Sequence, residues 1–260
     1  MKLYFWMPTC TKTLSTYLYL PDLTIILNMT KKIPGLVILL LSLFHWVNAQ
    51  TSREQTGWFF FMNSTKLNDK WGLHLDVQVR SHDNWNGVRN ILIRPGLTYF
   101  IRSNQNATAG YLYVPTLPVK GAMLTEHRIW EQYIISHKVF TGNFSHRFRL
   151  EQRFIEKANN ERVFTQRFRY FFRHIQPLSK LEGPFVKGPF TALQNEVFLN
   201  IQNKENTNNR FFDQNRSYLA GGYRFSKKLD IEAGYMNVFG KGAAADNVNN
   251  VAQLAIYTRF

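Results

Sequence analysis

Serine and histidine stand next to each other at three places, Ser81-His82, Ser136-His137 and Ser145-His146. A serine beside a basic histidine is the pair that hydrolases and acyltransferases use for nucleophilic catalysis. Adjacent residues of a strand point to opposite faces, so none of these pairs can hydrogen-bond within one regular strand. Pairing between strands stays open, and hydrolase or acyltransferase chemistry is therefore kept as an alternative.

The spacing of residues does not indicate a metal site or a nucleotide-binding loop. No HExxH motif occurs, and histidine, aspartate and glutamate nowhere cluster at the spacing of metal ligands. Gly221-Gly222 stands within an alternating stretch, whereas a phosphate-binding loop would lie between a strand and a helix. We therefore expect no metal, no cofactor and no enzymatic activity.

Arginine has the most regular spacing of the charged residues. From His146 to Arg173 the sequence reads HRFRLEQRFIEKANNERVFTQRFRYFFR, with arginine at nearly every second position and Phe, Leu or Tyr in between. In a strand, this spacing makes one face basic and the other apolar. The formal net charge of +15 would also suit nucleic acid. Strict alternation, together with the export signal described below, argues against that partner.

The two-residue period recurs along the chain in stretches separated by clusters of Asn, Gly, Asp and Lys, and no helical period persists. Roughly ten tilted residues are enough for a strand to cross a bilayer core, and several stretches reach that length. The candidate strands cover 57–63, 71–81, 89–102, 107–115, 125–138, 144–156, 162–174, 190–201, 214–226, 229–239 and 250–260.

The N-terminal part contains a candidate export signal. Two lysines precede the apolar run 33–44, and the sequence VNA before Gln50 is typical of a signal-peptide cleavage site. We predict a signal peptide at 29–49 that is cleaved between Ala49 and Gln50. Residues 1–28, which hold the only cysteine, are interpreted as a spurious upstream extension, so the mature chain would contain no cysteine.

Alternation alone allows two closures of the sheet. A soluble barrel or sandwich turns its apolar face inward, whereas a membrane barrel turns it toward lipid and lines a wet lumen with charge. The export signal, the strand lengths and the last strand favour the membrane barrel. In the last strand Leu254, Ile256 and the C-terminal Phe260 alternate and resemble the assembly signal of bacterial outer-membrane barrels, although Thr258 stands where an aromatic residue is usual.

We predict an all-β protein whose residues 50–260 form a transmembrane, antiparallel, up-and-down β-barrel in the outer membrane of a Gram-negative bacterium. About twelve strands (10–12) are expected, because eleven candidates conflict with the even number usual in bacterial barrels. Either 57–63 is not a full crossing, or PLSKLEGPFVKGPF (177–190) hides a strand. Expected partners are outer-membrane lipid and, through the C-terminal strand, the barrel-assembly machinery. Candidate aromatic belts comprise Trp58, Trp71, Tyr99, Tyr111, Tyr113, Trp130, Tyr133, Tyr170, Tyr223, Tyr235 and Tyr257.

The charged faces would line the lumen of this barrel, because a Lys or Arg facing the bilayer midplane costs about 2–4 kcal/mol. A positive lumen would pass small anionic or polar solutes. If Arg–Glu pairs fill the interior instead, the barrel is closed and serves a structural or partner-binding role. An outer-membrane lipid-modifying hydrolase or acyltransferase is the alternative. The candidate lining residues are Arg94, Arg128, Arg147, Arg149, Arg153, Arg167, Arg169, Arg173, Arg216, Arg224, Glu126, Glu151, Glu196 and Glu232.

Six motifs follow one another along the predicted mature chain. They are LTEHRIWEQY (124–133), HRFRLEQRF (146–154), RFRYFF (167–172), LQNEVFLN (193–200), DQNRSYLAGGYRF (213–225) and IEAGYMN (231–237). Their order resembles the DUF2490 family, uncharacterised proteins mainly of Bacteroidetes that are grouped with outer-membrane β-barrels. The resemblance spans about 55–260. It implies the barrel architecture and the location, and it brings no catalytic residues.

Overall fold

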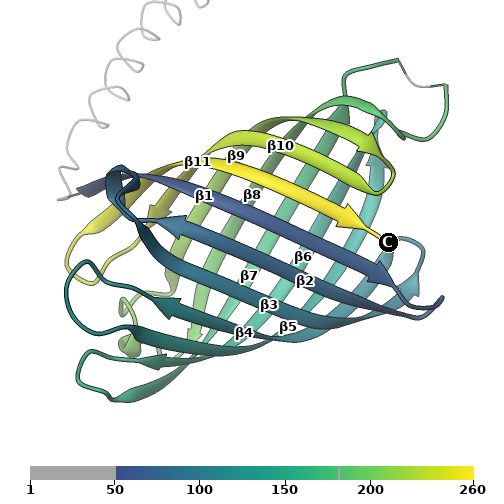
Figure 1. Cartoon of the computed structure of the whole chain (residues 1–260). Coiled ribbons are helices and arrows are strands. Elements are labelled where there is room, and N and C mark those ends of the chain that lie inside the picture. Colours follow the sequence, from purple (N-terminus) through teal and green to yellow (C-terminus); the bar gives the residue numbers. More distant parts are fainter. Residues whose placement is uncertain (1–50, 181) are drawn as a thin grey trace, which may run out of the picture. The chain divides into compact units, whose positions relative to one another are not determined.

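The computed structural model describes residues 51–180 and 182–260, which form one closed β-barrel (Figure 1). The strands are β1 (Thr51–Lys66), β2 (Trp71–Ser81), β3 (Val88–Arg102), β4 (Gln105–Thr116), β5 (Leu124–Val139), β6 (Gly142–Glu156), β7 (Arg162–Pro177), β8 (Gly188–Gln202), β9 (Phe212–Ser226), β10 (Leu229–Gly240) and β11 (Asp246–Arg259). Two short 3-10 helices, η2 (Asp83–Trp85) and η3 (Lys204–Asn206), lie in connections. The predicted all-β barrel is confirmed.

Several N-terminal predictions cannot be compared with the barrel. The signal peptide at 29–49, its cleavage between Ala49 and Gln50, and the spurious extension at 1–28 lie outside the described residues and stay predictions. Within 51–180 and 182–260, no helix has the length and apolarity needed to cross a membrane.

The order of the strands around the barrel follows the chain, and each strand is antiparallel to the next. The barrel closes by a parallel pairing of β1 with β11, which runs from Thr51 opposite Asp246 to Ser64 opposite Arg259. An odd number of strands in an up-and-down order makes the first and last strands run in the same direction. The prediction of a wholly antiparallel sheet is therefore corrected at this one seam.

The described residues form eleven strands, which lies within the expected range of 10–12, but the preference for an even number, twelve, is wrong for this part of the chain. The segment 57–63 lies within a full-length strand, β1. The described residues of 178–187 contain no strand. Proline has no N–H to donate to a ladder and glycine weakens a strand, and this connection contains both.

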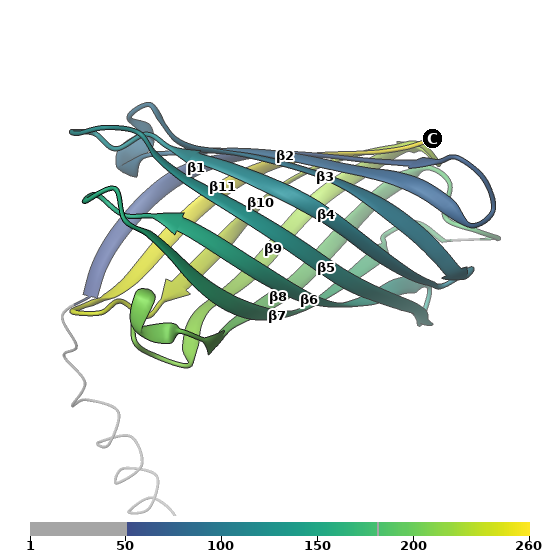
Figure 2. The same ribbon diagram turned by 90° about the horizontal axis from the view of Figure 1, so that it is seen from below.

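The two ends of the barrel differ in their connections (Figures 1 and 2). We call the end that carries Phe260 the turn end, because three of its connections contain only residues 103–104, 140–141 and 227–228. The longer connection 178–187 also lies there. The opposite end, the loop end, carries connections 82–87, 117–123, 157–161, 203–211 and 241–245. Strands tilt across the barrel between the two ends (Figure 2).

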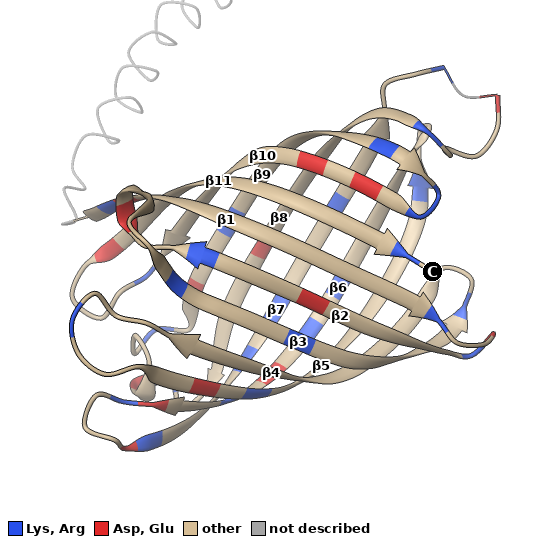
Figure 3. Ribbon diagram, in the orientation of Figure 1, with Lys and Arg blue, Asp and Glu red and all other residues tan. Residues whose placement is uncertain are grey.

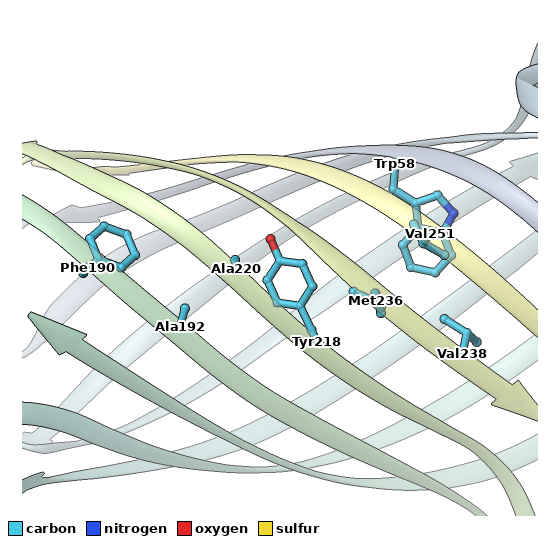
Figure 4. Packing of buried hydrophobic residues seen from close by; sticks show 8 residues of the cluster. All are labelled: Trp58, Phe190, Ala192, Tyr218, Ala220, Met236, Val238 and Val251. Atoms are coloured by element: carbon cyan, nitrogen blue, oxygen red, sulfur yellow. The ribbon is translucent and has the colours of Figure 1, made fainter. Parts of the chain in front are cut away.

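Part of the inner wall is apolar. Figure 4 shows a cluster from β1 and from β8 to β11 in which Trp58, Phe190, Tyr218 and Met236 pack with smaller residues. Side chains fill much of the interior of a small barrel, and apolar ones can do so where they contact one another. The inner face is therefore not uniformly charged, which the alternation pattern alone does not reveal.

Glycines make room for the largest buried side chain. Trp130 of β5 is fully buried, and it lies over Gly96 of β3 and Gly110 of β4. A Cβ on Gly110 would lie 2.5 Å from the Trp130 ring and 2.3 Å from the carbonyl oxygen of Pro95. Contacts this short are not tolerated in packed interiors. The two glycines therefore allow the indole ring to pack closely against the inside of the sheet.

Three of the aromatic residues predicted for membrane belts lie inside the barrel. Trp58, Trp130 and Tyr257 are all buried, whereas Trp71 and Tyr235 are exposed on the outer face. The alternation of side chains along a strand explains the difference, because Trp130 lies two residues from both Arg128 and Gln132 and therefore shares their inner face. The belt interpretation is corrected for these three residues.

Candidate functional site

The charged candidate residues all lie on the inner face of the barrel. None of the ten arginines and four glutamates predicted to line the lumen is exposed, and Arg149 and Glu151 are almost completely buried. Residues at the alternate positions of the strands point outward and include many apolar side chains, such as Phe148, Leu193 and Leu219, which are exposed by 40%, 53% and 61%. Figure 3 shows how the charged positions are distributed over the strands. The charged candidates thus lie inside the barrel, and the exterior is rich in apolar side chains.

A continuous ladder of ion pairs crosses one side of the interior, from β5 to β9. It begins at Glu126, whose Oε1 accepts hydrogen bonds from Nε of Arg128 at 2.7 Å and Nε of Arg153 at 2.6 Å. Arg128 also reaches the next rung, because its Nη1 lies 3.3 Å from Oε2 of Glu151. One arginine therefore links two carboxylates.

Glu151 is the centre of this ladder. Besides Arg128, its carboxylate accepts hydrogen bonds from Arg167, at 2.8 Å from Nη2 to Oε2, and from Arg169. Arg167 also donates to Asp213 of β9, at 2.9 Å. The side chain of Glu151 is completely buried, and three guanidinium groups surround it. A buried carboxylate is tolerated only when such partners replace its hydration.

Glu196 of β8 extends the ladder toward the turn end. Its Oε1 accepts hydrogen bonds from Nη2 of Arg169 at 2.7 Å and from Nη2 of Arg147 at 2.8 Å. Every arginine of this ladder thus has a carboxylate in direct contact. We use the name arginine ladder for Glu126, Arg128, Arg147, Glu151, Arg153, Arg167, Arg169, Glu196 and Asp213.

Smaller ion-pair groups lie elsewhere in the interior. Nη2 of Arg173 lies 2.5 Å from Glu232, whose carboxylate also accepts a hydrogen bond from the Tyr257 hydroxyl at 2.9 Å. Arg224 pairs with Asp230 at 2.7 Å, and Arg259 contacts the same carboxylate. On β2 and β3, Nη1 of Arg94 lies 2.5 Å from Oδ1 of Asp76, and His74 contacts the other oxygen at 3.1 Å.

Three interior arginines differ from all of these. Among the residues that the structure describes, Arg80, Arg149 and Arg216 have no carboxylate within 4.0 Å. Each donates to a glutamine: Arg80 to Gln78, Arg149 to Gln132 and Arg216 to Gln214. Each guanidinium also lies over an aromatic ring. Their positive charge is therefore not neutralised by direct contact.

Two cavities occupy the interior on either side of a layer of arginines. The turn-end cavity has a volume of about 560 Å³ and extends to the β5–β6 turn and the connection 178–187. The loop-end cavity has a volume of about 470 Å³ and extends to η3 and Lys157. Four arginines line both cavities, and we call them the arginine layer: Arg80, Arg94, Arg169 and Arg216. A solute that passed from one cavity to the other would have to cross this layer.

The serines and histidines do not form a catalytic pair in the described part of the chain. The Ser136 hydroxyl hydrogen-bonds to the Ser145 hydroxyl at 2.8 Å, and Nδ1 of His146 to the Tyr170 hydroxyl at 2.9 Å. His127 contacts the hydroxyl of Tyr111. No hydrogen bond joins a serine hydroxyl to an imidazole within 51–180 and 182–260, and no group of His, Cys, Asp or Glu there could hold a metal ion. The hydrolase alternative therefore gains no support from this geometry.

The C-terminal strand lies at the parallel seam. Leu254 is exposed on the outer face, Ile256 is half-buried on the same face, and Phe260 is exposed just beyond the end of β11. Phe260 still pairs with β1, because its backbone N–H donates to the carbonyl of Ser64 at 2.9 Å. The three residues thus alternate along the outside of the barrel.

The prediction missed several residues that take part in the interior site. Asp76 and Arg80 lie on the polar face of the strand 71–81, so the two-residue alternation alone would place them among the residues that line the lumen. Trp58 gives no such signal, because Phe59, Phe60 and Phe61 follow it and make both faces of that stretch apolar. Its position beneath Arg80 and Arg216 is visible only in the closed barrel.

Comparisons with known proteins can now be set beside this geometry. A solved structure described as the NanC porin is similar to this chain with a TM-score of 0.48 and 10% sequence identity, over 75% of this chain and 93% of that chain. No curated protein has significant sequence similarity to the chain. The family model described as "Protein of unknown function (DUF2490)" matches residues 55–249, which is most of the barrel. The chain, with its arginine-lined barrel, belongs to the DUF2490 family.

Proposed function

We propose that this protein is an outer-membrane β-barrel of a Gram-negative bacterium, and that its lumen gives small anionic solutes a narrow passage. The arginine layer between the two cavities carries this proposal, because the layer contains two arginines, Arg80 and Arg216, without a carboxylate partner among the described residues. A positively charged constriction attracts anions and repels cations.

The apolar exterior supports a membrane location. Leucines on the outer faces of three strands are exposed, Leu73 and Leu97 by 47% each and Leu219 by 61%. Soluble monomers rarely expose broad continuous apolar surfaces, whereas a closed barrel in lipid needs an apolar outer band and leaves no open sheet edge. On this proposal the protein contacts outer-membrane lipid, and the barrel-assembly machinery recognises the outward residues Leu254, Ile256 and Phe260.

The orientation follows from the connections. Bacterial outer-membrane barrels have short periplasmic turns and longer extracellular loops. We therefore place the turn end and its cavity on the periplasmic side, and the loop end on the outer surface.

Conductance in planar lipid bilayers tests the proposed passage. Purified protein should give single-channel currents whose reversal potential in a KCl gradient shows preference for chloride over potassium. The double variant Arg80→Gln and Arg216→Gln should lower the anion-to-cation permeability ratio about threefold or more, because it removes the charges that no carboxylate neutralises.

Arg102→Gln is the matched control, because Arg102 carries the same charge and is exposed at the turn end of β3. Its selectivity should equal that of the wild type. Absence of any current from a folded, inserted barrel would overturn the passage and favour a filled barrel with a structural or partner-binding role.

A further inference from the structure

The two cavities share the arginine layer but differ in their other walls. In the loop-end cavity most of the remaining lining is polar or charged, with Asn90, Thr116 and Asn208 among its residues. In the turn-end cavity the same arginines face a wall of apolar and aromatic side chains that includes Phe60, Met62, Ile134, Phe171, Ile175 and Phe185. A solute in the turn-end cavity can therefore contact positive charge and apolar surface at the same time.

Arg80 and Arg216 line this cavity, and each has hydrogen-bond donors that no described residue engages. The Arg80 guanidinium lies 4.0 Å and that of Arg216 5.2 Å from the centroid of the Trp58 ring. Stacking occupies the flat face of a guanidinium and leaves its in-plane N–H groups available. Gln78 accepts from Nε and Nη2 of Arg80, and Gln214 from Nε of Arg216.

Nη1 of Arg80 and both Nη atoms of Arg216 consequently have no hydrogen-bond partner among the described residues. These are the donors that pair with a carboxylate or a phosphate in two-pronged geometry. The other arginines that line this cavity are already engaged, for example Arg147 and Arg169 with Glu196 and Arg224 with Asp230.

We propose that the turn-end cavity binds an organic anion with an apolar body, its anionic group on Arg80 and Arg216 and its body against Met62 and the neighbouring apolar wall. This inference rests on the proposed anion passage and names the solute class that it favours. The volume of about 560 Å³ is within the range of sites that hold small organic molecules. An inorganic anion would satisfy the arginines but would leave the apolar wall in contact with water.

Calorimetric titration of the full-length protein, purified in detergent, tests the solute class. The probes are 3-phenylpropionate, its uncharged amide 3-phenylpropionamide, and inorganic phosphate, each with an empty-micelle control. We expect 3-phenylpropionate to bind about tenfold more tightly than either of the others, because only it uses both charge and apolar contact. Phosphate binding equal to that of 3-phenylpropionate would overturn the inference.

Two variants separate the two parts of the site. Arg216→Gln should weaken 3-phenylpropionate binding about tenfold by removing donors to the carboxylate. Met62→Gln should weaken it about threefold and leave phosphate binding unchanged, because the side chain keeps its length but loses its apolar character. Arg80→Gln serves as the second charge variant if Arg216→Gln does not fold.

Arg102→Gln is the control, because Arg102 carries the same charge, is exposed and lines neither of the two cavities. It should leave the affinity for 3-phenylpropionate unchanged, and an equal loss there would contradict the assigned site. Failure of the two proposals can be told apart. Anion-selective current without preference for 3-phenylpropionate removes only the solute class, whereas specific binding without current removes only the passage.

Discussion

The arginine ladder and the pair Arg80–Arg216 use the same residue type in opposite ways. In the ladder, carboxylates hold guanidinium groups that come from neighbouring strands, and Glu151 alone contacts three of them. Arg80 and Arg216 instead lie against the Trp58 ring and donate to glutamines two residues away on their own strands. The first arrangement links neighbouring strands, and the second leaves positive charge without a carboxylate in contact, which on the proposed passage is available to a solute.

The difference teaches that the number of arginines in a lumen does not by itself determine selectivity. A guanidinium in contact with a carboxylate presents little net charge to a passing ion, and its removal leaves a buried charge without a partner. A guanidinium stacked on an aromatic ring keeps its net charge, since the attraction to the ring involves no neutralisation. On the proposed function, the partners of an arginine therefore distinguish a structural role from a role in solute passage.

The largest effect is expected from Glu151→Gln. The change removes the charge that three arginines share and leaves those cations buried together. We expect the free energy of unfolding to fall by about 3–5 kcal/mol, measured by urea unfolding in lipid vesicles and followed by tryptophan fluorescence.

Glu131→Gln is the control for this prediction. Glu131 lies on the same sheet but is exposed on the outer face, where Gln152 donates to it at 3.2 Å. Its replacement should not reduce stability. If Glu151→Gln and Glu131→Gln unfold alike, the ladder does not hold the strands together.

A smaller effect is expected from Trp58→Leu. The substitution removes the ring that supports Arg80 and Arg216 and leaves the arginine ladder intact. We expect a loss of about 2 kcal/mol in unfolding free energy by the same urea measurement. Trp71→Leu is the control, because it changes an exposed tryptophan on the outer face and should reduce the free energy of unfolding less. An equal reduction would show that Trp58 has no specific role in supporting the two arginines.

The smallest effect on the fold is expected from salt. Raising the salt concentration from about 0.1 M to about 1 M shortens the Debye length from about 10 Å to about 3 Å. Anion selectivity in bilayer recordings should decrease, because the charges of Arg80 and Arg216 act through water. The urea midpoint should change little, since the ladder pairs are in direct contact; a large drop in that midpoint would show that solvent reaches the ladder.

Much of the fold and of the site could be predicted from alternation. In β6 and β7 arginines alternate with Phe, Leu and Tyr, so parity alone places Arg149 and Arg169 on one face and Phe148 and Phe168 on the other. The strand that contains Trp58 could not be assigned in this way, because its apolar run fills both faces. Alternation also located eleven candidate strands, each of which overlaps a strand of the structure. What failed was the expectation of an even number, because a parallel pairing of the first and last strands is decided only when the sheet closes.

What the sequence determined by itself is sidedness: a two-residue period assigns each side chain to one face of its strand, whatever the neighbouring strands are. Only the tertiary structure decided the partners. Arg173 and Glu232, for example, are 59 residues apart and meet inside the barrel. Such groups are brought together by the strand register, the strand tilt and the parallel pairing of β1 with β11. All three features arise only when the whole sheet closes. Closure thus determines which arginines are neutralised and which keep their charge.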